Sequence, residues 1–216
     1  MDLYEIIHKR RDTRHFLPEE IPEEVLRKAF QAAFSAPSVG LSEPTNYYLI
    51  KDREIKKEIH TLFVAANNKA MDRIQNDATK EQYKSLKLQG ILEAPAGLII
   101  TTNYSVLKEF TIGVIGTADA LQWSSVCALQ NLWLSLTEQG YSLGWVSILD
   151  YNGLQKLLQL PAHEKPLGYF CIGKAADEYN NQPMLEQLGW KNRKENKVKE
   201  NLWRWKENKT IIIDNQ

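Results

Sequence analysis

The densest group of charged side chains in the sequence is Lys9-Arg10-Arg11-Asp12-Thr13-Arg14-His15. It holds four lysine or arginine side chains and one carboxylate in seven positions. A planar guanidinium grips a phosphate through two parallel charged hydrogen bonds, each worth about 1.5–3 kcal/mol net. We call residues 9–15 the basic turn. Held in a folded turn they would form a compact anion site; the same residues on an ordinary surface turn would only be solvated.

Two other segments could contact a ligand. Ala36–Pro44 is a non-helical loop of small residues, and small side chains let backbone amides and hydroxyls approach a flat ligand closely. An ordinary connecting loop would have the same composition. Leu143–Leu149 is apolar with one hydroxyl near its end, Ser147. A buried serine is usually satisfied by backbone groups, so Ser147 alone is a weak functional signal.

The spacing of apolar residues predicts helices next to these segments. Leu3, Ile6 and Ile7 predict a short helix that ends at the basic turn, where cations suit the helix C-terminus. Pro22 and the acids after it begin a second helix, which stops before Pro37. The longest helix is predicted over 118–139 and ends at Gly140.

The remaining segments predict a mixed α and β class. The polar stretch 54–89 suggests surface helices or a lid. Four short, apolar, β-rich segments predict strands among the helices; they are Asn46–Ile50, Gly97–Thr102, Leu143–Leu149 and Leu167–Ile172.

Composition restricts the class of protein. The length of 216 residues predicts one large domain or a domain with appendages, and 43% hydrophobic and 25% charged residues are typical of a folded globular protein. The 27 basic and 27 acidic residues cancel, which argues against a protein that neutralises nucleic-acid phosphates over a broad face. No stretch approaches the roughly 20 apolar residues that span a bilayer, so we expect no membrane partner and a cytoplasmic location.

Common cofactor and metal signatures are missing from the sequence. There is no GxGxxG, no Walker loop and no GxSxG. Cys127 and Cys171 supply neither a disulfide framework nor a zinc knuckle, and the four histidines lack metal-ligand spacing. We therefore expect no metal, and a reducing compartment.

Several segments, taken in order, resemble the nitroreductase-like flavoprotein superfamily, and most closely its 5,6-dimethylbenzimidazole synthase (BluB) branch. The resemblance covers nearly the whole chain and is specific in combination. The matching segments are Arg10–Phe16, Ala36–Leu41, Leu92–Pro95, Gln130–Leu134, Leu143–Ile148 and Glu186–Trp190.

This resemblance implies an α+β fold with a central, mainly antiparallel sheet flanked by helices, in a domain-sharing homodimer. It implies FMN at the subunit interface, bound by a domain over 1–193. In the tail, Lys, Glu and Asn alternate with Trp203, Trp205 and a final Ile211–Ile213, so it is too apolar in places for plain disorder. From this composition we expect residues 194–216 to form an arm packing on the partner subunit. The implied reaction fragments reduced FMN with dioxygen to 5,6-dimethylbenzimidazole, the lower ligand of vitamin B12, and erythrose 4-phosphate. An external flavin reductase could supply the reduced flavin.

The resemblance also implies roles for individual residues. The two catalytic positions of the branch fall on Asp12 and Ser147. The cofactor-binding positions fall on Arg10, Arg11, Asp12, Thr13, Arg14, Ser38, Val39, Gly40, Ser147 and Arg193, with Ser38–Gly40 reaching the ring from the partner subunit.

Asp12 is the discriminating residue, because general nitroreductases usually carry serine there. Reduced flavin is an anion, and a carboxylate about 4 Å away would repel it by roughly 4 kcal/mol at an effective dielectric near 20, before neighbouring arginines offset the charge. A hydride shuttle has no evident use for that group. Cleavage of the ribityl link does, because a positioned carboxylate can remove and return a proton.

Two alternatives stay open at this point. The first is an NAD(P)H-dependent FMN nitroreductase or flavin reductase, which would share the fold and the basic turn. The second is a non-catalytic flavin-binding or interaction protein that uses its tail to bind a partner. The segment Leu41–Asn46 also departs from the family, where an aromatic residue and an uncharged amide are more usual.

Overall fold

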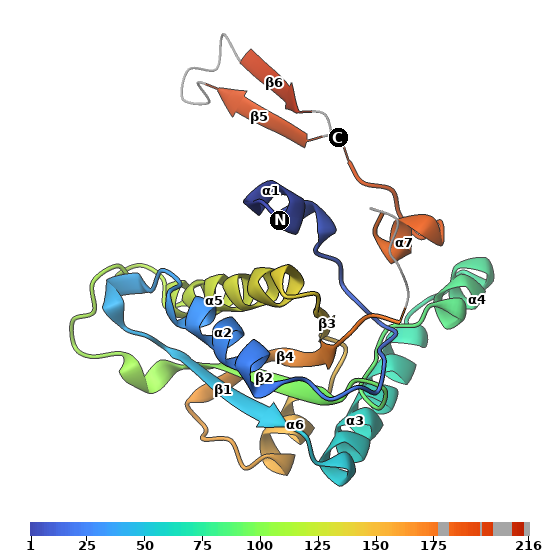
Figure 1. The fold of residues 1–216 in the computed structure, drawn as a ribbon, viewed down its shortest axis with the longest axis horizontal. Helices are drawn as coiled ribbons and strands as arrows, with labels where there is room; N and C mark the ends of the chain where they lie inside the picture. Colours follow the sequence, from blue (N-terminus) through green and yellow to red (C-terminus); the bar gives the residue numbers. More distant parts are fainter. Residues whose placement is uncertain (177–181, 195, 201–208, 214–216) are drawn as a thin grey trace. The chain divides into compact units, whose positions relative to one another are not determined.

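The computed structural model describes residues 1–176, 182–194, 196–200 and 209–213, and the chain divides into two compact units, residues 1–181 and 182–216. The first unit is built on one four-stranded sheet (Figure 1). Every strand pair in it is antiparallel, and the order is β1-β2-β4-β3. The strands are β1 (Thr45–Ile50), β2 (Ala96–Asn103), β3 (Ser142–Val146) and β4 (Glu164–Gly173).

Helices cover both faces of this sheet because its central strands are apolar on both faces. On β2, Leu98 and Ile100 face the core cluster of α2 (Glu23–Phe34) and α5 (Asp119–Glu138). The residue between them, Ile99, faces the opposite cluster, formed with α3 (Arg53–Met71) and α6 (Tyr151–Leu157). Figure 1 shows α2 and α5 on one side of the sheet and α6 on the other. The predicted α+β class is confirmed.

The helices largely follow the sequence pattern. α1 (Leu3–Lys9) begins with a capping box between Asp2 and Glu5 and ends at the basic turn, as predicted. α5 agrees within one residue at each end with the predicted helix, and Gly140 after it has φ +78°, the left-handed conformation expected there.

The polar stretch 54–89 contains two helices of different character. α3 buries Ile59 and Phe63 in the second core cluster, so it is more than a surface helix. α4 (Asp77–Ser85) buries none of its residues. Two short 3₁₀ turns, η1 (Val39–Leu41) and η2 (Tyr104–Val106), lie in the connections.

The second unit contains α7 (Met184–Gln187) and an antiparallel pair of strands, β5 (Asn196–Glu200) and β6 (Lys209–Ile213). The tail tryptophans Trp203 and Trp205 lie outside the described residues. The expected domain boundary after residue 193 and the packing of the arm on a partner stay predictions.

No helix among the described residues is long and apolar enough to cross a membrane. In the same part of the chain, no three histidine, cysteine or acidic side chains gather in a way that could hold a metal ion.

Candidate functional site

The basic turn lies along the open edge of β3, which is an end strand of the sheet. Asp12 forms a parallel bridge with Leu143, and the Thr13 N–H donates to the Leu143 carbonyl at 3.1 Å. An edge strand presents unpaired backbone groups that need partners. The turn supplies them, and this places its side chains beside β3.

Gly144 allows the turn to come this close. A Cβ built on Gly144 would lie 2.0 Å from the Thr13 carbonyl oxygen, a separation that no side chain tolerates. Thr13 itself is only 1% exposed, so it cannot move aside easily. The glycine of the Gly-Trp-Val-Ser motif is therefore required by close backbone approach.

The Asp12 carboxylate is held by two donors. The Trp145 N–H of β3 donates to Oδ1 at 2.8 Å, and the Arg14 guanidinium pairs with Oδ2. The Arg14 side chain is 10% exposed, whereas that of Asp12 keeps 44% of its surface open to solvent. The carboxylate is thus fixed in direction yet accessible from one side.

The pKa of Asp12 is raised above its usual value of 3.8. The largest cause is the surrounding protein, which desolvates the charged form although one side of the group is open. Arg14, the Trp145 N–H and Arg10 act in the opposite direction and offset part of the rise. A carboxyl group with a raised pKa exchanges protons more readily near neutral pH than an ordinary aspartate.

Among the three arginines of the turn, Arg10 and Arg11 are the more accessible, since both are half-buried while Arg14 is buried. The Arg10 guanidinium lies 4.6 Å from the ring centroid of Trp133 on α5, a cation–π contact that orients it. The Arg11 guanidinium donates to the Arg10 carbonyl at 2.7 Å. After Arg14 has paired with Asp12, these two cations leave the site positively charged.

Ser147 lies just past the end of β3, two residues after the amide that binds Asp12. The predicted strand to Leu149 was wrong at this end. After Val146 the chain turns into α6, with the Tyr151 hydroxyl donating to the Ser147 carbonyl at 3.2 Å and Asp150 capping the helix. Ser147 is exposed, and its own hydroxyl makes no hydrogen bond with the described residues.

The small-residue loop is anchored to α5. The Val39 N–H donates to the Ser124 hydroxyl at 3.0 Å, and the Ser38 hydroxyl accepts from the Glu43 N–H at 2.8 Å. Gly40 has φ +55°, and a Cβ there would lie 2.5 Å from the Ile112 carbonyl oxygen.

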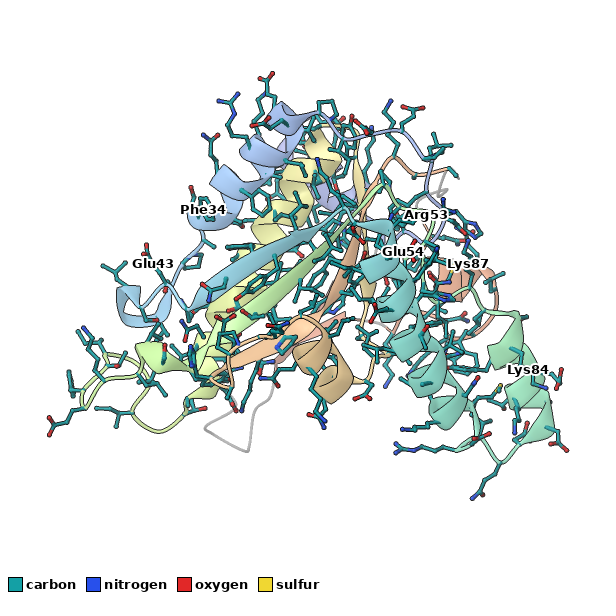
Figure 2. The ribbon with its side chains drawn as sticks, turned by 90° about the horizontal axis from the view of Figure 1, so that it is seen from below. Phe34, Glu43, Arg53, Glu54, Lys84 and Lys87 are labelled. Carbon is teal, nitrogen blue, oxygen red and sulfur yellow. The ribbon has the colours of Figure 1, made fainter. Side chains whose placement is uncertain are left out.

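A cavity of about 240 Å³ lies between this loop, α2 and β1. Phe34, Ser38 and Glu43 are among the residues that line it. Figure 2 labels Phe34 at the end of α2 and Glu43 on the loop. Residues 38–40 are thus held next to α5 through Val39, whereas Asp12 is held at β3.

Arg193 belongs to the second unit, where its N–H donates to the Glu186 carboxylate at 3.2 Å and its side chain is exposed. Its assignment as a phosphate ligand stays a prediction.

Two groups that contact site residues were not predicted from the sequence: the Trp145 backbone amide and the Trp133 ring. The Trp145 backbone amide carries no side-chain signal, although the glycine before it indicates a close approach. Trp133 belongs to the Gln130–Leu134 motif, but helical periodicity alone assigns it to the core. The stacking on Arg10 depends on how α5 packs.

A model of the nitroreductase family matches residues 7–174. The chain belongs to the nitroreductase family. The 5,6-dimethylbenzimidazole synthase of Rhodospirillum rubrum is 33% identical over 189 residues, which cover 88% of this chain and 89% of that protein. The synthase of Rhodobacter capsulatus is 31% identical over 188 residues, covering 87% and 90%.

Solved structures of other proteins share the fold. Oxidized iodotyrosine deiodinase bound to FMN and 3-iodo-L-tyrosine aligns with a TM-score of 0.70 at 22% identity, covering 84% of this chain and 94% of that one. A BluB-like flavoprotein from Clostridium difficile 630 aligns with a TM-score of 0.66 at 19% identity, covering 87% and 97%. The predicted family, fold and enzyme class are confirmed.

The raised pKa of Asp12 predicts that the difference in the free energy of unfolding between the wild type and the Asp12→Asn variant depends on pH. The folded chain has the raised pKa, so stability from Asp12 protonation is fully present below the unfolded value near 3.8 and is lost as pH rises through the folded value. The free energy of unfolding of the wild type minus that of D12N should therefore increase on acidification from pH 7 to 4. Urea titrations at several pH values measure it.

Asp12→Ala is the second variant in that series. It should reproduce the pH trend of the difference at lower overall stability, because the Trp145 N–H loses its acceptor. If the difference in the free energy of unfolding instead decreases on acidification, the effect of Arg14 on the pKa of Asp12 is larger than the effect of burial.

Proposed function

We propose that this nitroreductase-family protein binds FMN and fragments its reduced form with dioxygen to 5,6-dimethylbenzimidazole and erythrose 4-phosphate. The observation that carries the proposal is the position of the Asp12 carboxylate. It accepts a hydrogen bond from the Trp145 N–H of β3, and Trp145 is two residues before Ser147. The names of the relatives at 31–33% identity support the same reaction. Reduced flavin for it would come from an external reductase.

The basic turn fits the phosphate of FMN. Arg10 and Arg11 are half-buried, and Arg10 is oriented on Trp133, so their guanidinium groups are partly preorganised for an oxyanion. Buried Thr13 and Arg14 hold the turn from behind. Bound reduced FMN would supply the carbon atoms of the product and the electrons for dioxygen.

Asp12 would move the proton that cleavage of the ribityl link requires. Its Oδ1 and Oδ2 each accept one hydrogen bond, which fixes the carboxylate, and 44% of its side-chain surface stays exposed. A base of raised pKa can both take and return a proton at neutral pH. Arg14 offsets the negative charge, so an anionic flavin is repelled less than an unpaired aspartate would repel it.

Ser147 would donate a hydrogen bond to the reacting edge of the flavin. Its hydroxyl is exposed and makes no hydrogen bond with the described residues, so it has a donor to offer a ligand. Its position is set by Tyr151, which holds the Ser147 carbonyl.

A second candidate function is an NAD(P)H-dependent nitroreductase or flavin reductase. The Arg14–Asp12 ion pair favours it, because a neutralised carboxylate is less of an obstacle to a simple redox carrier. The two reactions differ in the fate of the flavin, which only the first consumes.

The protein would act as a homodimer with FMN at the subunit interface. The described surface exposes four large apolar side chains on two adjacent loops: Leu41, Phe110, Ile112 and Ile115, at 87%, 66%, 68% and 75% exposed. The loops meet where Gly40 approaches the Ile112 carbonyl. Exposed apolar groups of this size favour burial against another surface, and a second copy would bring Ser38–Gly40 to the flavin of its partner.

The reaction itself is tested by incubating the protein with chemically reduced FMN in air and measuring 5,6-dimethylbenzimidazole by mass spectrometry. The wild type should form the product with loss of flavin. D12N should form it at least about 100-fold more slowly, because general acid–base groups contribute about 10²–10⁴-fold. Glu20→Gln removes an exposed carboxylate near the turn and should keep the wild-type rate.

Intact flavin after this incubation would reject the fragmentation reaction. Steady oxidation of NAD(P)H with a nitroaromatic acceptor would then establish the reductase. If neither reaction occurs and D12A changes only flavin affinity, the protein is a non-catalytic flavin binder.

Placing a charge in the exposed apolar loops should disrupt the dimer. Ile112→Asp should sediment as a monomer and lose FMN affinity, since a buried unpaired carboxylate is costly. Leu92→Asp places the same charge at an exposed apolar residue elsewhere on the chain and should stay dimeric. A dimeric I112D protein would exclude these loops from the interface.

The C-terminal arm is tested by truncation after Asn196. If residues 194–216 pack on the partner, the truncated chain should dissociate at a higher protein concentration in sedimentation experiments than the full chain. An unchanged dimer would reject the arm.

A further inference from the structure

The C-terminal part of α3 faces a cavity of about 380 Å³ that also contains Ser147. Ala66, Lys69 and Ala70 lie on one face of α3, and Arg73 lies in the turn just after the helix ends at Met71. All four line this cavity. Its other wall is the segment 147–152, which leads from β3 into α6. Contacts join α3 to α6, and both lie on the same side of the sheet (Figures 1 and 2).

The two alanines are small enough to leave space at this wall, and the two cations make the lining positively charged. Ala66 and Ala70 occupy little volume in this wall, and Lys69 and Arg73 are exposed. Neither cation forms an ion pair or side-chain hydrogen bond with the residues that the structure describes. Among the lining residues the one acid is Asp150, whose Oδ1 accepts from the Gly153 N–H as the α6 cap. The lining therefore carries a net charge of one positive unit.

We propose that this cavity is an oxyanion subsite for a second ligand, distinct from the FMN phosphate. Lys69 and Arg73 would bind a phosphate or carboxylate group and hold the rest of that ligand beside Ser147. The proposal rests on the proposed function only in placing Ser147 at the reacting edge of the flavin. The basic turn, which lies along the edge of β3 and lines no part of this cavity, would bind the flavin's own phosphate.

Cations at a helix C-terminus also stabilise the helix through its dipole, so a purely structural role must be separated from binding. That role predicts lower thermal stability when the charges are removed, with no change in anion affinity. Ligand binding predicts loss of anion affinity in the flavin-loaded protein. The paired measurement distinguishes them.

The test uses the flavin-loaded protein at constant ionic strength, so that screening does not change during the titration. Inorganic phosphate and benzoate are titrated separately while the flavin absorption spectrum and the free flavin after filtration are measured. Saturable spectral change without flavin release is expected for at least one probe. Response to phosphate alone indicates a phosphorylated ligand, and response to benzoate indicates a carboxylate.

Lys69→Gln/Arg73→Gln should weaken that binding at least tenfold. The control Arg27→Gln/Lys51→Gln removes two exposed cations elsewhere and should keep wild-type affinity. No saturable response, a response explained by flavin release, equal weakening in the control, or a K69Q/R73Q protein that loses only thermal stability would each overturn the subsite. These titrations measure anion binding and not product, so their outcome does not depend on the outcome of the benzimidazole assay.

Discussion

The open edge of β3 is the constraint on which the site depends. An edge strand must satisfy its outward backbone groups, and here the segment after α1 does so with a backbone bond from Thr13 and a side-chain bond to Asp12. The glycine at 144 permits this contact, because any side chain there would strike the Thr13 carbonyl. The same interaction that closes the sheet edge therefore also aims the carboxylate and gathers the arginines around it.

Burial and charge act against each other at Asp12. The protein around the carboxylate raises its pKa, while Arg14 and the β3 amide stabilise the ionised form. The ion pair weakens the simple picture of an unpaired negative group repelling an anionic flavin. What remains is a fixed carboxylate that can hold or release a proton, flanked by Arg10 and Arg11, which keep the surroundings positive. This balance suits acid–base chemistry on an anionic ligand.

The end of β3 is also where the two halves of the core meet. Trp145 packs with the α2–α5 cluster, whereas Val146 belongs to the α3–α6 cluster. The basic turn lies along the edge of this strand, and Lys69 of α3 and Arg73 just after the helix line the cavity beside Ser147. Two groups of cations that are far apart in the chain thus lie near the residues at the end of β3.

Local patterns in the sequence were sufficient for much of this protein. Periodicity determined α1, α2 and α5, the apolar segments determined the strands to within a few residues, and the motif order indicated the nitroreductase family. The end of β3 was misplaced because Ser147–Leu149 is as apolar as a strand, and only the α6 cap and the Tyr151 contact turn the chain away. The link from Asp12 to Trp145 joins residues 133 positions apart through a backbone amide that has no side-chain signature. Likewise, Lys69 and Arg73 read as ordinary solvated charges until α3 packs beside α6 and brings them to Ser147. Such pairings depend on how the sheet edge and the two helix layers come together, and that is decided by packing over the whole chain.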